Sequence, residues 1–244
     1  MKIDKYKYLG NSKYKLLIDD MEYILYEDII INNNLLSKKN ITKEELDNIL
    51  KDNSFYDGYY MAISNLKRKM RSKKELFIYL EKQEIEKSYI NKIVDKLEHE
   101  GYINDEVFCK SYINDAILLT DNGPLKLKKD LEKLGIEETI IDNNLLKFSK
   151  EKIKEKIKKI GDKELRLNKK YSSCEIRQKI KNKLILKGYY MEDILDYLED
   201  ITFDDAKIKD ETKKKIYDKL SKKYSGQELE FKVKQKLYSK GFRD

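Results

Sequence analysis

The fold of this chain is decided by three stretches that end alike: Leu131-Glu132-Lys133-Leu134-Gly135, Leu184-Ile185-Leu186-Lys187-Gly188 and Leu237-Tyr238-Ser239-Lys240-Gly241. Successive glycines are 53 residues apart. A related stretch, Leu80-Glu81-Lys82-Gln83-Glu84, places glutamate 51 residues before Gly135, where the pattern calls for glycine. A fixed period of this length is typical of a protein built from repeated structural units.

Each stretch closes a pattern of apolar residues at helical spacing. Two series stand four and eight residues before the final position: Leu80, Leu131, Leu184 and Leu237, then Leu76, Leu127, Ile180 and Val233. Residues four apart share one face of a helix, and a glycine after such a stripe is typical of the left-handed residue that ends a helix. A second helix is predicted by apolar residues six and ten positions further on: Ile90, Ile141 and Ile194, then Val94, Leu145 and Leu198.

The first helix of each copy also carries a start signal. Ser-x-x-Glu capping boxes begin at Ser72, Ser172 and Ser225, and Gly123-Pro124 opens the helix in the second copy. A third helix is predicted over residues 105–121, 150–160 and about 206–220. We therefore expect three-helix repeats over 72–122, 123–171 and 172–222, followed by a truncated fourth repeat over 223–244 that is one capping helix. Because a repeat of this size buries little apolar surface alone, we expect the repeats to support one another in an elongated arc.

The first 71 residues follow a different pattern. Residues 14–18 and 21–26 predict a β-hairpin with its turn at Asp19-Asp20. Residues 32–34 predict a loop, and Thr42 with Glu45 caps a short helix that ends near Leu50. A longer helix is expected from about residue 54 to residue 70. Residues 1–71 therefore form a separate N-terminal module, and the fold class is mainly α.

Composition supports a helical protein and excludes several classes. The chain has 244 residues, of which 40% are charged and 40% hydrophobic, with only 9 Gly and 1 Pro to make tight turns. Its longest apolar runs are far shorter than the roughly 20 residues of a membrane span, and the N-terminus lacks the apolar core of a signal peptide. Two isolated cysteines, Cys109 and Cys174, predict neither a disulfide framework nor a zinc site. We expect a cytoplasmic monomer without cofactor or metal.

Positive charge is concentrated in one part of the sequence. The formal net charge is +8, and residues 147–183 alone contain 15 Lys and Arg against 5 Asp and Glu. Such an excess is typical of a surface that meets phosphate or an acidic partner. Seven side chains in this stretch are the candidate partner or DNA contacts: Lys154, Lys158, Arg166, Lys169, Lys170, Arg177 and Lys181.

Three features together resemble the family of bacterial RecX regulatory proteins. They are residues 71–76 (RSKKEL), residues 100–108 (EGYINDEVF) and a helix opened by Gly123-Pro124. The resemblance spans about residues 67–200, and the hairpin resembles the N-terminal extension of Gram-positive members. It implies a protein without enzymatic chemistry that binds the RecA recombinase filament on single-stranded DNA and restrains its recombinase and coprotease activities. Cys109 stands where the family usually has alanine, and a small buried thiol packs similarly.

Other functional assignments have weaker support in the sequence. Three-helix units in a basic chain are also compatible with a direct DNA-binding regulator, which is the alternative function. A metal-dependent nuclease would need converging carboxylates, and the sequence has no catalytic motif to support it. His99 is expected at a helix end, and the pairs Tyr59-Tyr60 and Tyr189-Tyr190 are expected to pack in cores more than to stack on bases.

Overall fold

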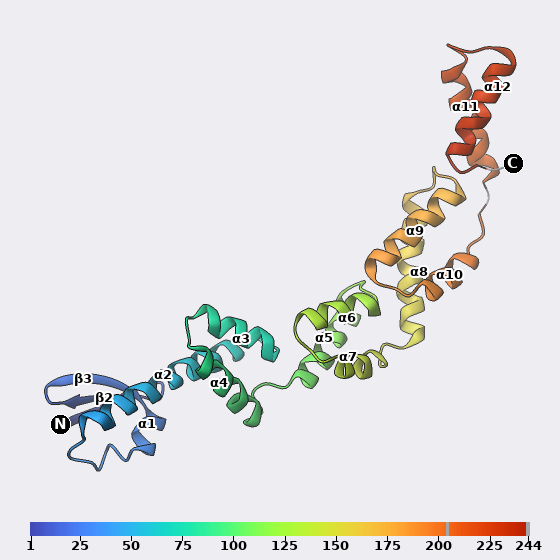
Figure 1. The fold of residues 1–244 in the computed structure, drawn as a ribbon. Coiled ribbons are helices and arrows are strands. Elements are labelled where there is room, and N and C mark those ends of the chain that lie inside the picture. The colour runs from blue at the N-terminus through green and yellow to red at the C-terminus, as the bar shows by residue number, and fades with distance from the viewer. Residues whose placement is uncertain (204, 243–244) are drawn as a thin grey trace. The chain divides into compact units, whose positions relative to one another are not determined.

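The computed structural model describes residues 1–203 and 205–242, so residues 243–244 of the predicted fourth repeat lie outside it. The chain divides into two compact units, Met1–Phe108 and Cys109–Asp244. Helices account for most of the described residues, and one small antiparallel sheet lies at the N-terminus (Figure 1). The predicted fold class, mainly α with tandem helical repeats after a β-containing module, is confirmed.

The N-terminal sheet has three strands in the order β1-β2-β3. Strands β2 (Lys13–Ile18) and β3 (Met21–Tyr26) form the predicted hairpin, and Asp19 and Asp20 adopt φ values of 44° and 64° in its turn. Such positive φ values match the turn to the right-handed twist of the strands. Strand β1 (Ile3–Gly10), which pairs with β2, is absent from the sequence prediction.

The helices that cover this sheet differ from the prediction. Helix α1 (Glu27–Asn32) precedes the expected loop, and α2 (Lys43–Leu66) is one continuous helix where two were expected. The break predicted near Leu50 is wrong because Asn53 continues the helix and uses its side chain elsewhere. Its amide accepts from Tyr26 N at 2.9 Å and donates to Ile24 O at 3.2 Å, which anchors α2 to β3. The predicted capping box of Thr42 and Glu45 is present.

Within the described residues, ten further helices follow, three in each predicted repeat and one at the end. Their bounds are α3 (Lys73–Lys82), α4 (Lys87–His99), α5 (Asp105–Leu119), α6 (Pro124–Lys133), α7 (Glu138–Leu145), α8 (Lys150–Leu167), α9 (Ser173–Lys187), α10 (Met191–Glu199), α11 (Ala206–Leu220) and α12 (Gly226–Ser239). The predicted anchor leucines Leu80, Leu131, Leu184 and Leu237 are all buried. Helix α8 is two turns longer than expected.

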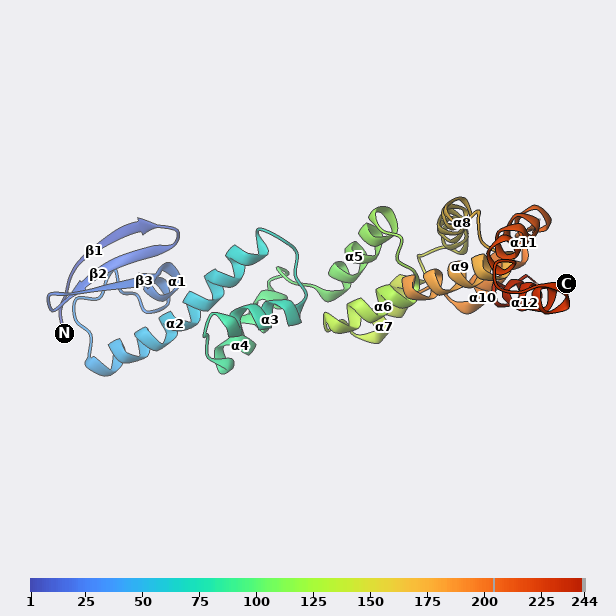
Figure 2. The ribbon, with the colours of Figure 1, turned by 90° about the horizontal axis from the view of Figure 1, so that it is seen from above.

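Helix packing joins the last helix of one sequence repeat to the first two of the next. Helix α2 packs on α3 and α4 around Leu76, Leu80 and Leu97. In the second unit, α8 packs on both α9 and α10, and α11 packs on α12 (Figure 2). In these three groups the packing is therefore shifted by one helix from the repeats predicted at 72–122, 123–171 and 172–222, and those domain boundaries stay a prediction.

The repeat glycines lie where helices of successive repeats meet. Gly188 caps the end of α9 and has a φ of 81°. Gly241 follows the cap residue of α12 and has a φ of 79°. Gly123 N donates to Lys187 O at 2.7 Å, and Ser172 Oγ donates to Lys240 O at 2.6 Å. In each case, a residue at the start of the first helix of one repeat forms a hydrogen bond with a residue at the end of the first helix of the next repeat. A Cβ on Gly241 would approach Ser172 Oγ to 2.7 Å, so glycine permits the close approach.

The capping signals are realised to different extents. Ser72 forms the full capping box with Glu75, whereas Ser172 accepts from Glu175 N at 3.3 Å and also bonds the next repeat. The prediction for Ser225 is wrong, because its side chain makes no cap hydrogen bond. Glu84 adopts a φ of 61° where the other copies have glycine.

Candidate partner-contact surface

Helix α8 carries most of the basic stretch of residues 147–183. Its apolar side is buried, and this determines which of its side chains can face solvent. Ser149 caps its start by accepting from Lys152 N at 3.3 Å. Ile153, Ile157 and Ile160 are buried against α9 and α10. Gly161 is buried beneath the ring of Tyr197, whose hydroxyl donates to Asp162 Oδ1 at 3.1 Å. Most of the remaining surface of α8 therefore faces solvent.

The cations of α8 fall into two rows rather than one. Helical geometry places one row within an arc of about 80°, at roughly 100° per residue. We call it the α8 basic row, and its members are Lys152, Lys156, Lys159, Lys163 and Arg166. Lys150, Lys154 and Lys158 lie on the other flank, and Glu151, Glu155 and Asp162 lie between the two rows. The structure thus separates Arg166 from Lys154 and Lys158, which the sequence analysis grouped together.

The α8 basic row borders a hollow of about 300 Å³ at the end of α5. Lys156 donates to Thr120 O, and Lys159 Nζ lies 3.8 Å from Asp121. Burial lowers the pKa of Lys156. Leu118 and Leu119 line the same hollow and are 77% and 81% exposed. The row therefore combines positive charge with uncovered apolar surface.

The other predicted cations before α9 are exposed, with different surroundings. Lys154 borders a second hollow, of about 520 Å³, together with the acidic side chains Glu192, Asp193 and Asp196 of α10. Lys158 is exposed on α8, and Lys169 and Lys170 are exposed in the connection to α9. Lys158, Lys169 and Lys170 therefore present charge to solvent, while Lys154 faces an acidic neighbourhood.

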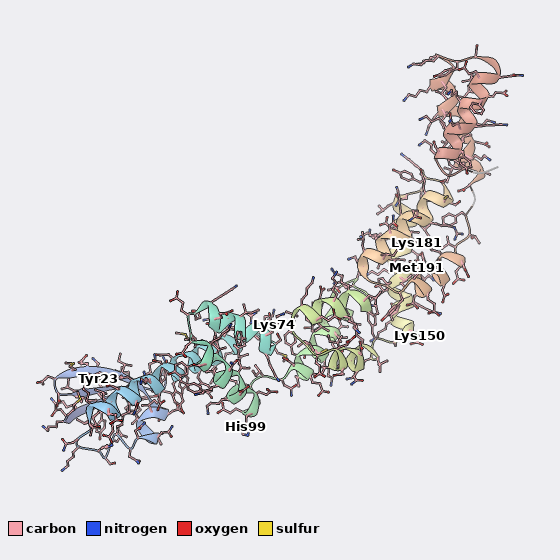
Figure 3. All side chains as sticks on the ribbon, viewed as in Figure 1. Tyr23, Lys74, His99, Lys150, Lys181 and Met191 are labelled. Atoms are coloured by element: carbon pink, nitrogen blue, oxygen red, sulfur yellow. The ribbon has the colours of Figure 1, made fainter. Side chains whose placement is uncertain are left out.

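Arg177 has a structural role that the sequence did not reveal. Its guanidinium donates to Leu198 O and, at 2.8 Å, to Ile201 O, and it lies 4.8 Å from the centroid of the Phe203 ring. These bonds hold the end of α10 and the segment after it. Lys181 lies one turn further along α9 and is half-buried (Figure 3). Both residues are therefore less available to a partner than the exposed Lys158, Lys169 and Lys170.

The structure also places the remaining candidates. His99 is the last residue of α4 and is exposed, as expected. Tyr59 and Tyr189 are buried in cores, while Tyr190 is exposed. Cys109 is buried, Cys174 is exposed, and neither forms a disulfide. Within the described residues, no group of three or more Asp, Glu, His or Cys side chains could hold a metal ion.

The α8 basic row could have been recognised from the sequence. Its members recur at intervals of four, three, four and three residues, which is the period of one helix face. Density along the chain, which pointed to the whole stretch 147–183, does not distinguish this face from the rest. Among the described residues, no helix has the length and apolarity of a membrane span.

Comparison with known proteins identifies the family. No family model matches the chain. Regulatory protein RecX of Bacillus cytotoxicus is 31% identical over 92% of this chain and 84% of its own length. Regulatory protein RecX of Staphylococcus haemolyticus is 31% identical over 99% of this chain and 93% of its own length.

Solved structures agree with this relationship. A crystal structure of regulatory protein RecX has a TM-score of 0.75 and 22% identity, covering 82% of this chain and 99% of its own. The crystal structure of RecX from Lactobacillus salivarius has a TM-score of 0.57 and 28% identity, covering 61% of this chain and 98% of its own. The resemblance found in the sequence is confirmed, and the chain belongs to the RecX family of regulatory proteins.

Proposed function

We propose that this protein binds the RecA recombinase filament on single-stranded DNA and inhibits its recombinase and coprotease activities, without enzymatic chemistry of its own. The observation that supports this proposal most is its sequence relationship to RecX regulatory proteins over almost the whole chain. Its role is to modulate DNA repair and recombination. Several weak contacts along the repeats give high avidity for a filament that itself repeats.

The proposed contact surface is the exposed cationic surface of α8 and of the connection that follows it. It includes Lys158, Arg166, Lys169 and Lys170 from the sequence analysis, with Lys154 at its margin beside the acidic side chains of α10. The α8 basic row extends it next to the uncovered Leu118 and Leu119. Arg177 and Lys181 lie outside it. Acidic protein surface and DNA phosphate both fit this chemistry.

Titration into a RecA ATPase assay tests the function. RecA is assembled on single-stranded DNA, and the protein is added from far below to equal the RecA concentration at two salt concentrations. We expect loss of ATPase at substoichiometric protein, because one chain that bridges protomers acts on more than one of them. We also expect weaker inhibition at high salt, since salt screens exposed charges. Unchanged ATPase up to equimolar protein contradicts the proposal.

A further inference from the structure

Strand β1 is unusual because it takes almost no part in a core. Only Ile3 packs against the cluster formed by the sheet, α1 and α2. Every residue from Asp4 to Leu9 is exposed, on both faces of the strand. A strand that only stabilised the sheet would bury alternate side chains. Packing in a core therefore does not explain which side chains β1 carries.

The exposed side chains of β1 alternate between lysine and tyrosine. Lys5 and Lys7 project from one face, while Tyr6 and Tyr8 project from the other and are 57% and 54% exposed. Lys7 pairs directly with Lys15 of β2. Like charges in directly opposed positions destabilise a sheet, and here Glu22 compensates the charge of Lys15 but not that of Lys7.

Local charge favours an anionic partner. Residues 2–15 contain five lysines and one aspartate, a net charge of +4. Lys2 lies 2.7 Å from Asp4 and Lys15 lies 2.8 Å from Glu22. Among the described residues, no carboxylate pairs with Lys5 or Lys7. Both border a hollow of about 230 Å³, together with Lys15, Tyr6, Leu17 and Glu22.

The edge of β1 is also open. Beyond its first residue, where Ile3 N donates to Lys39 O at 2.9 Å, the described structure gives β1 no neighbour on the side away from β2. By contrast, Asn53 satisfies part of the opposite edge, at β3. An extended chain can therefore lie along β1 without displacing any element of the fold.

From this geometry we propose that the open edge of β1 is a binding surface for single-stranded nucleic acid. The nucleic acid lies along this edge, so that Lys5 and Lys7 contact phosphates on one side of it and the exposed ring of Tyr6 stacks on a base on the other. The ring of Tyr8, which lies 5.0 Å from the ring of Tyr14, extends this aromatic side. Alternate residues of a strand are about 7 Å apart, which is comparable with the spacing of phosphates along an extended nucleic acid strand. Basic grooves combined with aromatic side chains are the usual means of binding single strands without sequence preference.

Fluorescence anisotropy with the full chain and a labelled oligothymidine tests this surface in the absence of any recombinase. The oligonucleotide has about 20 nucleotides, longer than the roughly 4–16 nucleotides that one single-strand-binding module covers. Lys5→Gln/Lys7→Gln should lower the slope of log affinity against log salt by about 1.4, because each lost phosphate contact removes about 0.7. Tyr6→Ser/Tyr8→Ser should weaken binding by at least about tenfold.

Lys43→Gln/Lys51→Gln is the matched control, since both lysines are exposed on α2 in the same unit and the charge change is equal. This control should retain the wild-type slope. The proposal is overturned if the control and the β1 variants behave alike, if the wild-type chain does not bind the oligonucleotide, or if an oligoglutamate of equal length competes as well as unlabelled oligothymidine. Because no recombinase is present, failure here leaves the proposed inhibition of RecA untouched.

Discussion

At the scale of single residues, glycine serves two separate purposes in the repeat. Gly188 needs both a positive φ and space, because a Cβ would collide with the backbone of Lys126 in the preceding repeat. Glu84 has the same backbone conformation with a side chain, at a φ of 61°. It begins the series of copies, so no earlier repeat requires a close approach there. This accounts for the departure from glycine in the first copy.

We predict that Gly188→Ala destabilises the second unit by about 2–4 kcal/mol, from left-handed strain together with a backbone collision. Gly226→Ala is the matched control, since Gly226 has a φ of 56° and a Cβ added there would meet nothing within 4 Å. It should cost only about 1–2 kcal/mol. Urea unfolding followed by circular dichroism measures both variants, and equal losses would show that the contact with Lys126 is unimportant.

The hydroxyl of Ser172 is predicted to hold α12 in place. Ser172→Ala removes a cap and the bond to Lys240 O, so we expect a loss of about 1–2 kcal/mol and faster amide hydrogen exchange in α12. Ser225→Ala removes a serine whose side chain makes no cap bond, and it should change stability by less than about 0.5 kcal/mol. Similar exchange rates in the two variants would refute this role.

Tyrosines between α2 and its neighbours make the N-terminal unit sensitive to alkali. Burial, and a hydrogen bond to Asp28 at 2.6 Å, raise the pKa of Tyr60 to about 12. Since the folded state holds this proton more tightly than the unfolded state, its contribution to stability is complete below pH 10 and is lost between about pH 10 and 12. Tyr60→Phe should make unfolding less dependent on pH in this window, as followed by thermal melts; an unchanged dependence would contradict the assignment.

At the scale of elements, the sequence predicted what depends on local pattern and missed what depends on tertiary contact. Apolar spacing located the repeat helices because their apolar residues pack on one face, which in α11 is only half-buried. The predicted break in α2 failed because Asn53 bonds β3, a contact that no local pattern reveals. Strand β1 was missed because its exposed lysines and tyrosines show no alternation between a core and a solvent face. The backbone partners of Arg177 were missed for a related reason, since they come from the segment around the end of α10.

For α8, we predict that the basic row matters more than the flank that carries Lys154. Reversing four of its charges with Lys152→Glu/Lys159→Glu/Lys163→Glu/Arg166→Glu should abolish inhibition of RecA while helical content stays intact. Lys156 is left unchanged because it bonds Thr120 O. Inhibition that persists would exclude the row as the contact surface.

The matched control reverses four exposed lysines of α11 and the turn after it, Lys214, Lys215, Lys219 and Lys222. It changes net charge by the same amount and should retain inhibition. Loss of inhibition in both variants would mean that total charge, rather than the α8 surface, governs the effect.

At the scale of the whole molecule, repetition gives the chain several similar units that can each contact a repeating partner. The bonds from Gly123 to Lys187 and from Ser172 to Lys240 link successive repeats in the second unit. Linked contacts of this kind raise avidity without any strong individual contact. The proposed function therefore requires binding to an assembled filament rather than to a single protomer.

Co-sedimentation with preassembled RecA filaments tests this central claim most directly. The protein is mixed with filaments on long single-stranded DNA, with free RecA and with DNA alone, and bound protein is measured in each pellet. We predict strong binding to the filament that saturates at one chain per several RecA protomers. The account would be contradicted if the protein did not bind the filament, or if it bound the filament no more strongly than DNA alone.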